Sequence, residues 1–232
     1  MSLDGLLDVF FPPRCVACAE VLPTPGFFCA DCAPLLLETP SVHCERCGEP
    51  GQFEGARCPR CTQSVPSFDR AYAPFEHEGS LAKAIHRFKY EGRSELSKPL
   101  AQLMASGEAA QLPGTVCPMP LHASRYRERG YDQATLLAVE VAKVLGRPYD
   151  DSLLTRERAT VHQVGLSELE RDANVRGAFA ASSAARGQRL VLIDDVLTTG
   201  ATAREAARVL KEAGAAKVCV LTLARARRAS LR

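Results

Sequence analysis

The sequence lacks tryptophan, has few aromatic residues and contains no long apolar run. No hydrophobic stretch approaches the roughly 18 residues that a membrane span needs, so we expect no membrane insertion. The first residues include Asp4 and Asp8 and lack the basic region of a secretory signal, which argues against export. Together these absences predict a cytoplasmic protein. The scarcity of aromatic rings also leaves little that could stack on a nucleobase.

The chain has no large excess of either charge, since its formal net charge is +2 over 232 residues. That balance hides an asymmetry, because residues 1–61 carry a net −4 and the remainder a net +6. Attraction to phosphate-rich partners therefore belongs to the larger, C-terminal part. Its last eight residues, RARRASLR, contain four arginines. We interpret them as a solvated end, with contact to nucleic acid as the alternative.

Cysteine is nearly absent after residue 61 and concentrated before it, where eight of the ten cysteines lie. They form two sets with the same C-x2-C-x10-C-x2-C spacing. Four thiolates on two short turns make the closed tetrahedral set of a structural zinc site. A disulfide framework is the alternative, but it needs an oxidising compartment. The spacing therefore predicts two structural Zn²⁺ ions, bound by Cys15, Cys18, Cys29, Cys32, Cys44, Cys47, Cys58 and Cys61.

We expect sequential pairing, with the first four cysteines on one ion and the last four on the other, although spacing leaves a cross-braced arrangement open. Zinc binding, worth roughly 10–16 kcal/mol in finger peptides, would supply most of the folding free energy of so small a segment. Eight thiolates and two zinc ions add a formal −4 to an already acidic segment, so phosphates would be repelled. The module is therefore expected to cap, dock or recruit protein. Cys117 and Cys219 lie in apolar stretches and are expected in the core.

Strand patterns alternate with helix patterns after the cysteines, which indicates an α/β protein with a parallel sheet flanked by helices. The expected strands cover 70–76, 114–117, 189–193 and 217–223, and the expected helices begin at Gly79 and cover 95–106, 133–145 and 201–213. Residues 121–132 are expected to form a basic loop, and 151–178 a polar stretch without a strong period.

One strand–helix junction, VLIDDVLTTGAT at 191–202, carries the clearest chemistry. Asp194 and Asp195 stand at the carboxyl end of a strand, where ligands bind in parallel α/β sheets. The threonines and Gly200 then lead into a helix start, which favours a phosphate. Carboxylates repel that phosphate but accept hydrogen bonds from a vicinal diol, or face magnesium. The junction therefore predicts a ribose 5-phosphate site. Simple helix capping is the alternative, and a P-loop is excluded because no lysine follows the glycine.

This junction resembles the phosphoribosyl-diphosphate (PRPP) motif of type I phosphoribosyltransferases. The double cysteine repeat narrows the resemblance to the ComF family, which joins a double zinc ribbon to a phosphoribosyltransferase domain. FKYEGR (88–93), PMPLHASRYRERGYDQA (118–134) and RERATVHQVGLSELERDANVRGAF (156–179) are also similar to that family. Tyr131-Asp132-Gln133 departs from the expected Phe-Asn-Gln. The resemblance implies a zinc-ribbon module at 1–64 and a phosphoribosyltransferase-like domain at 70–232.

The resemblance also implies roles for individual residues. Asp194 and Asp195 are the catalytic acids that bind the ribose hydroxyls, and the 5-phosphate is cradled by Val196, Leu197, Thr198, Thr199, Gly200, Ala201 and Thr202. The pyrophosphate is approached by Pro120, Leu121, His122, Arg125 and Arg129, with Mg²⁺ bridging pyrophosphate and diol. A flexible loop within 156–178 closes over PRPP and carries Arg158, His162 and Gln163. A solvated, partly helical surface segment is the alternative for that loop.

Three functions are compatible with these features. The first is Mg-dependent displacement of pyrophosphate from PRPP by an unknown acceptor. The second is PRPP binding without turnover on the same fold. The third follows from the family's link to natural transformation, and is an accessory role with single-stranded DNA and DNA-uptake proteins. The sequence leaves the acceptor and the oligomeric state open.

Overall fold

The computed structural model describes residues 12–159 and 168–227. In chain order the elements are η1 (Ala33–Leu35), α2 (Pro59–Gln63), β1 (Arg70–Tyr72), β2 (Phe75–Glu76), α3 (Gly79–Tyr90), η2 (Ser94–Leu96), α4 (Ser97–Met104), η3 (Gly107–Gln111), β3 (Thr115–Pro118), α5 (Ala123–Arg129), α6 (Gln133–Leu145), β4 (Leu154–Arg156), α7 (Glu168–Val175), β5 (Phe179–Ala181), η4 (Ser183–Ala185), β6 (Arg189–Leu197), α8 (Ala201–Glu212) and β7 (Lys217–Arg225). Among the described residues, no helix has both the length and the apolar character required to cross a membrane.

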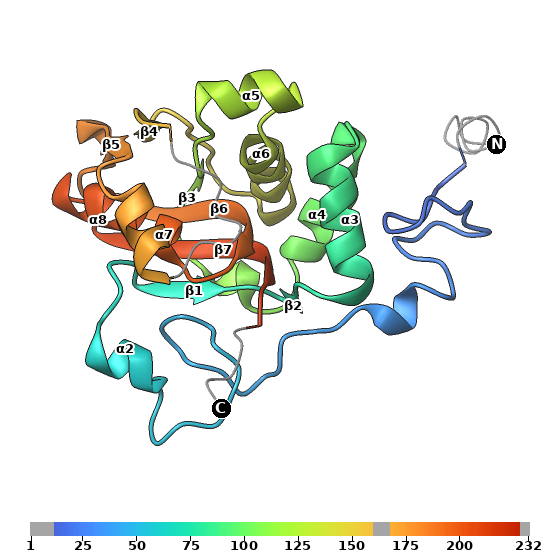
Figure 1. Cartoon of the computed structure of the whole chain (residues 1–232), viewed down its shortest axis with the longest axis horizontal. Helices are drawn as coiled ribbons and strands as arrows, with labels where there is room; N and C mark the ends of the chain where they lie inside the picture. Colours follow the sequence, from blue (N-terminus) through green and yellow to red (C-terminus); the bar gives the residue numbers. More distant parts are fainter. Residues whose placement is uncertain (1–11, 160–167, 228–232) are drawn as a thin grey trace.

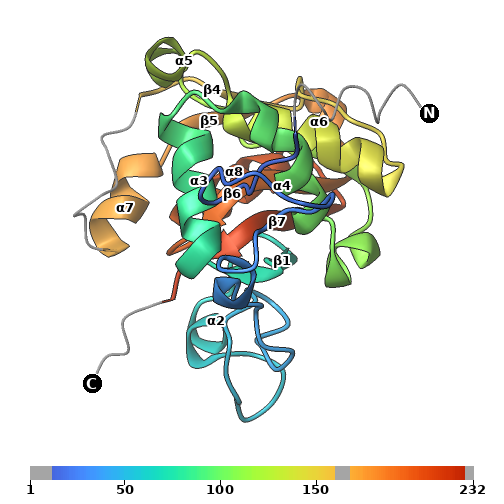
Figure 2. The same ribbon diagram turned by 90° about the vertical axis from the view of Figure 1, so that its right-hand side faces the viewer.

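The central sheet has the strand order β1-β7-β6-β3, with β2 also paired to β7, and its pairs are parallel. Alternation along the strands divides the core between two faces. Leu190 and Leu192 pack with α8, whereas Val191 and Ile193 pack with α3, α4 and α6. The helices therefore cover both sides of the sheet (Figures 1 and 2). This confirms the predicted parallel sheet flanked by helices.

Strand β6 is longer than the predicted 189–193, because its pairing with β7 continues to Leu197 opposite Arg225. Its pairing with β3 stops at Ile193, opposite Pro118. Asp194 and Asp195 therefore lie inside a strand rather than after it. They are accommodated there because the neighbouring strand β3 has already ended, which opens the sheet on that side.

The predicted basic loop at 121–132 is wrong, because it contains the helix α5. His122 caps its first turn by accepting a hydrogen bond from the Ser124 N–H, and Gly130 ends it at a φ of 80°. Arginine and alanine are good helix formers and glycine ends helices, so this basic stretch is compatible with a short helix. The polar stretch at 151–178 likewise contains β4 and α7, whereas 160–167 lies outside the described residues.

Helix α6 has the predicted bounds, but its apolar residues are not all buried. Leu137 and Val141 are buried. Val144, by contrast, is 48% exposed, and the small Ala134 and Ala138 are buried in its place. Because α6 packs closely through these alanines, its buried face is narrower than the full set of apolar residues in its sequence.

The two cysteine-rich segments dock on different parts of the sheet domain (Figures 1 and 2). The first runs beside α3 and α4, where Arg87 Nη1 donates to the carbonyls of Cys15 and Val16. The second lies below β1, where the Ala71 N–H donates to the Arg46 carbonyl at 2.8 Å. We call these segments the first ribbon (residues 15–32) and the second ribbon (residues 44–61).

Candidate functional site

A cavity of about 280 Å³ opens where β3 ends beside β6. Its walls come from the end of α3, the loop after β3, the start of α6 and the β6–α8 junction. Many of the predicted site residues meet there, namely Pro120, Leu121, Arg125, Asp194, Asp195, Val196, Leu197, Thr198, Gly200, Ala201 and Thr202. The fold thus brings the loop after β3 and the β6–α8 junction to one place.

The acid pair at the cavity is electrostatically asymmetric. Burial, and then the charge of Asp195, raise the pKa of Asp194 to about 7, which the charge of Lys89 partly opposes. Asp194 Oδ1 also accepts a hydrogen bond from the Asp195 N–H at 2.9 Å. Asp195 instead forms an ion pair with Lys89 at 2.8 Å, between side chains that are 13% and 18% exposed. The two acids therefore differ, because Asp195 is paired with a lysine whereas burial brings the pKa of Asp194 into the neutral range.

The turn between β6 and α8 is formed by Thr198, Thr199 and Gly200, which we call the threonine loop. Gly200 is the N-cap of α8 with a φ of 79°, in the left-handed region that glycine adopts without strain. Thr199 Oγ1 accepts a hydrogen bond from the Ala201 N–H at 3.4 Å. The first turn of a helix carries amide groups without intrahelical partners and a partial positive charge. This end of the cavity is therefore suited to an anion.

Four cationic side chains line the cavity, and each comes from a different element. Lys89 lies in the last turn of α3, Arg125 in α5, Arg156 at the end of β4, and Arg171 in α7. The Arg156 guanidinium lies 5.1 Å from the centroid of the Phe179 ring, which holds it in place. Burial and the charge of Arg125 lower its pKa. Besides Lys89, which pairs with Asp195, the three arginines suit a ligand with more negative charge than a single phosphate.

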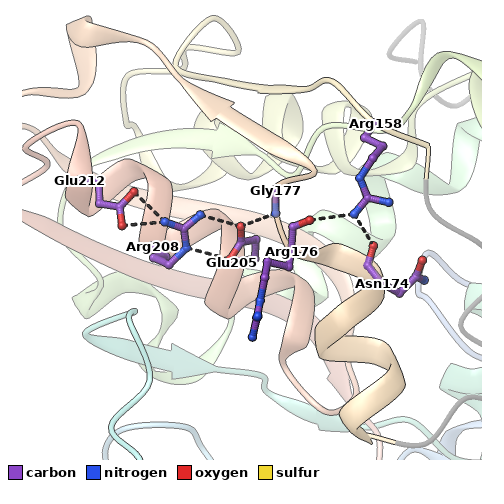
Figure 3. Close-up of polar contacts among 7 residues, drawn as sticks. All are labelled: Arg158, Asn174, Arg176, Gly177, Glu205, Arg208 and Glu212. Carbon is purple, nitrogen blue, oxygen red and sulfur yellow. Dashed lines mark hydrogen bonds and ion pairs between the residues drawn. The ribbon is translucent and has the colours of Figure 1, made fainter.

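Some predicted residues, Thr199 among them, are not part of this cavity. His122 caps α5, with Nδ1 3.2 Å from the Ser124 N–H. Arg158 Nη2 donates to the carbonyls of Asn174 at 2.9 Å and Arg176 at 2.7 Å, at the end of α7 (Figure 3). The side chain of Arg129, and the whole of His162 and Gln163, lie outside the described residues.

Hydrogen bonds and ion pairs hold helix α7 and the residues after it against α8 (Figure 3). The Gly177 N–H donates to Glu205 Oε1 at 2.7 Å, and Arg208 donates to both oxygens of Glu205 at 2.7 and 2.9 Å. Arg204 pairs with Asp172 across the same helices. The described end of the predicted flexible loop is therefore helical and held in place, and it presents Arg171 to the cavity.

Lys89 and Asp132 also line the cavity, although no motif in the sequence assigns either of them a role. Asp132 accepts hydrogen bonds from the Leu121 N–H at 3.1 Å and the Thr135 N–H at 3.2 Å, and its burial raises its pKa. It therefore connects the loop after β3 to the start of α6. Both residues lie in stretches that resembled the family, FKYEGR and RGYDQA, which was the available signal.

The eight N-terminal cysteines gather in two groups of four, and within each group the sulfur atoms lie within 4.8 Å of one another. The groups are sequential, which confirms the expected pairing. The Sγ–Sγ distances of 3.6 Å for Cys18–Cys29 and 3.7 Å for Cys47–Cys58 match the about 3.8 Å that tetrahedral Zn–S bonds impose. These residues fit two zinc sites of four cysteines each. Cys117 and Cys219 are buried in the sheet, as predicted.

Comparison with known proteins gives consistent results. The double zinc ribbon domain family matches residues 6–65, and the phosphoribosyl transferase domain family matches 132–232. The chain is 34% identical over 204 residues to the DNA utilization protein YhgH of Salmonella typhimurium, covering 85% of this chain and 89% of that protein. It is 31% identical over 228 residues to Competence protein F of Haemophilus influenzae, covering 94% and 99%. It is 30% identical over 207 residues to Competence protein ComFC of Bacillus subtilis, covering 85% and 83%.

Solved structures match part of the chain at lower similarity. The allosteric regulatory enzyme of purine biosynthesis has a TM-score of 0.39 at 24% identity, covering 56% of this chain and about a quarter (26%) of that one. A phosphoribosyltransferase from Corynebacterium diphtheriae has a TM-score of 0.35 at 17% identity, covering 60% and 69%.

Proposed function

Because the chain belongs to the ComF family, which is linked to competence and DNA utilization, we propose that its cavity binds PRPP with Mg²⁺ and catalyses displacement of pyrophosphate by an acceptor. One observation carries the proposal: a single cavity joins an acid pair to the start of a twelve-residue helix. In this proposal residues 1–64 form the ribbon module and 70–232 the transferase domain. The protein would act in the cytoplasm.

The two ends of the cavity suit the two ends of a phosphoribosyl group. Asp194 and Asp195 would accept hydrogen bonds from the ribose hydroxyls, and the threonine loop with the first turn of α8 would hold the 5-phosphate. Arg125, Arg156 and Arg171 would face the pyrophosphate and stabilise its charge as the bond to the anomeric carbon breaks. The acid pair supplies the oxygen donors that Mg²⁺ prefers, and Mg²⁺ when bound neutralises the leaving pyrophosphate.

Titration calorimetry tests the binding step. PRPP with Mg²⁺ is titrated into the wild type and into the double variant Asp194→Asn/Asp195→Asn. Asp150→Asn/Asp151→Asn is the matched control, because it removes an adjacent acid pair that does not line the cavity. We expect the cavity variant to bind at least about a hundredfold more weakly, since it loses two charged hydrogen-bond acceptors. Equal binding by wild type and cavity variant would show that the site is assigned wrongly.

Turnover needs a separate measurement. Pyrophosphate release from PRPP is followed with panels of nitrogen acceptors, with the cavity double variant as the background. Acceptor-dependent release identifies an enzyme. Tight PRPP binding without release under any acceptor favours a PRPP-binding protein on the same fold.

A second candidate function is single-stranded DNA binding beside DNA-uptake proteins, which the relatives named DNA utilization protein and Competence protein F favour. The sequence predicts a solvated basic tail, but two of its arginines are engaged within the protein. Arg225 is 3% exposed and pairs with Glu49, and Arg227 pairs with Glu76, so the tail supports DNA binding less than its sequence suggests. Anisotropy of a labelled oligonucleotide should fall steeply with added salt, and deletion of 228–232 tests the other arginines of the tail. Salt-insensitive or absent binding contradicts this candidate.

A further inference from the structure

The threonine loop separates the cavity described above, which we call the ligand cavity, from a second cavity on its other side. This second cavity has a volume of about 290 Å³ and is bounded by the second ribbon through Cys47, Arg60 and Cys61. Both cavities share Leu197, Thr198 and Gly200 as walls. The loop is therefore a thin wall with an open space behind it, and its position depends on the side chains that reach across that space.

Two arginines reach the same atom of this wall. Arg60 Nη2 donates to the Thr199 carbonyl at 3.3 Å, and Arg204 Nη1 donates to it at 2.8 Å. Arg204 belongs to α8, next to the loop, whereas Arg60 comes from the second ribbon, 139 positions away in sequence. The ribbon thus contacts the backbone that the proposed phosphate site uses.

The consequence follows from the geometry of the peptide group. In a planar trans peptide the C=O and the next N–H point in opposite directions. A Thr199 carbonyl held on the ribbon side therefore directs the Gly200 N–H to the other side of the wall, where the ligand cavity lies. Glycine permits many backbone conformations, so this peptide orientation is not fixed by Gly200 itself.

Arg60 in turn depends on the metal site. It lies in α2 between Cys58 and Cys61, two members of the second cysteine group. A helix of five residues has no stability of its own in water, so the cysteine ligands must hold α2 in place. The position of Arg60 therefore follows the occupancy of the second zinc site.

From this we infer that the second ribbon acts through Arg60 as a positioning element for the threonine loop, so that the metal in the second zinc site sets the affinity of the cavity for the phosphate end of its ligand. Arg60 is a positioning residue, because it lines the second cavity and not the ligand cavity. The affinity part of this inference rests on the proposed function. The orientation of the loop does not depend on it.

The chain provides a matched control. Arg46 precedes Cys47 in the same ribbon, just as Arg60 precedes Cys61. Arg46 Nη2, however, donates to the Pro66 carbonyl at 2.9 Å, and Nη1 lies 3.8 Å from Asp69. Arg46→Met therefore removes an arginine of the second ribbon without removing a donor to Thr199.

The experiment compares full-length wild type, Arg60→Met, Arg60→Lys and Arg46→Met, each with its zinc content and melting temperature determined. Hydrogen exchange of peptides covering 197–203 is measured without ligand, and binding of PRPP with Mg²⁺ is measured by calorimetry. For Arg60→Met we expect about fivefold faster exchange in this segment and about tenfold weaker binding, as befits one charged hydrogen bond. Arg46→Met should stay within about twofold of wild type in both.

Unchanged exchange and affinity in Arg60→Met would overturn the inference, as would equal effects in Arg46→Met. If Arg60→Met loses zinc, Arg60→Lys decides, because it keeps the charge while replacing the forked donor with a single point donor. If the wild type binds no PRPP, the proposed function fails. The exchange measurement then still decides whether Arg60 positions the loop.

Discussion

The first and second ribbons share one cysteine spacing and one set of four thiolates, yet they contact the sheet domain differently. The first ribbon docks on α3, where Ser80 Oγ donates to the Cys32 carbonyl at 2.6 Å and Arg87 donates to two ribbon carbonyls. In the second ribbon, the Cys47 carbonyl accepts a hydrogen bond from Arg225 at the end of β7, and Arg60 donates to the Thr199 carbonyl in the threonine loop. The same metal motif therefore supports a helix in one case and a candidate binding loop in the other.

The two docking sites also lie toward opposite ends of the candidate cavity. Helix α3 carries Lys89, which pairs with Asp195 at the acid end, two residues beyond the Arg87 that holds the first ribbon. The second ribbon reaches the threonine loop at the proposed phosphate end. Because Leu81, Ile85 and Phe88 are fully buried, α3 has ample support besides the first ribbon, whereas the threonine loop has a cavity behind it.

The largest effect should come from breaking one zinc site at a time. Cys29→Ser and Cys58→Ser are each expected to lower the bound zinc from two ions to one, since a structural site needs all four thiolates. We expect Cys58→Ser to weaken PRPP binding about a hundredfold and Cys29→Ser by less than about threefold. Metal analysis and calorimetry on the same samples measure both. Equal losses of affinity would contradict the difference between the ribbons.

A smaller effect should follow from removing the arginine that holds each ribbon. Arg225→Met removes an almost fully buried arginine, its ion pair with the partly exposed Glu49 and a 2.6 Å hydrogen bond to the Cys47 carbonyl, so we expect about 3 kcal/mol lower stability. Arg87→Met removes hydrogen bonds to the Cys15 and Val16 carbonyls and should cost about 1–2 kcal/mol. Denaturant unfolding measures both, and a larger loss for Arg87→Met would reverse the expected order.

The acid end of the cavity should respond to pH in a way that the ribbon side does not. Asp194 has its pKa raised to about 7 by burial and by Asp195, and the carboxylate is the form that accepts hydrogen bonds from hydroxyls. PRPP affinity should therefore rise by up to about tenfold between pH 6 and pH 8. Arg60→Met should show the same slope at lower affinity, because arginine does not titrate in that range. A changed slope in Arg60→Met would mean that the two ends are not independent.

Stability should change with pH in the opposite sense. A folded-state pKa above the unfolded value means that the native state binds the extra proton, so this contribution to stability is present at low pH and lost as pH rises through about 7. Asp194→Asn should therefore raise the melting temperature at pH 8 more than at pH 5. Asp150→Asn is the control, and a pH-independent effect of Asp194→Asn would contradict the raised pKa.

The smallest effect on stability should come from removing a hydroxyl group that donates to a cysteine carbonyl of each ribbon. Ser80→Ala should cost about 1 kcal/mol, because its buried hydrogen bond to the Cys32 carbonyl is lost. Thr62 donates to the Cys58 carbonyl at 3.2 Å from an exposed position, so Thr62→Val should cost less than about 0.5 kcal/mol. Neither should alter PRPP affinity. Thermal unfolding and calorimetry check the two expectations.

Local signals in the sequence predicted several local features, although they missed helix α5. Helix α6 has the expected bounds because Asp132 caps its start and Gly146 ends it in the left-handed conformation. The two cysteine groups were also predictable, since each set of ligands lies within one short segment. The acid pair and the threonine loop were found together because one strand–helix junction contains both.

Contacts between distant segments could not be predicted in this way. Strand β6 extends past Ile193 because β7 pairs with it there, and nothing within 189–197 indicates that partner. Lys89 reaches Asp195 from another element, and Arg60 reaches Thr199 across 139 positions. No periodicity or spacing links such pairs, so their discovery required the three-dimensional arrangement.

The strand order has a consequence for how the nascent polypeptide acquires its fold on the ribosome. Strand β7 lies between β1 and β6, and the Val218 N–H donates to Asp69 across 149 positions. Each cysteine group can capture its ion soon after emerging, because its ligands are close in sequence. Strand β1, however, cannot pair in the sheet until β7 has been translated. Its apolar side chains therefore remain exposed to solvent during most of synthesis. Chaperones that shield such surfaces should therefore engage this stretch early in translation and leave once β7 is in place.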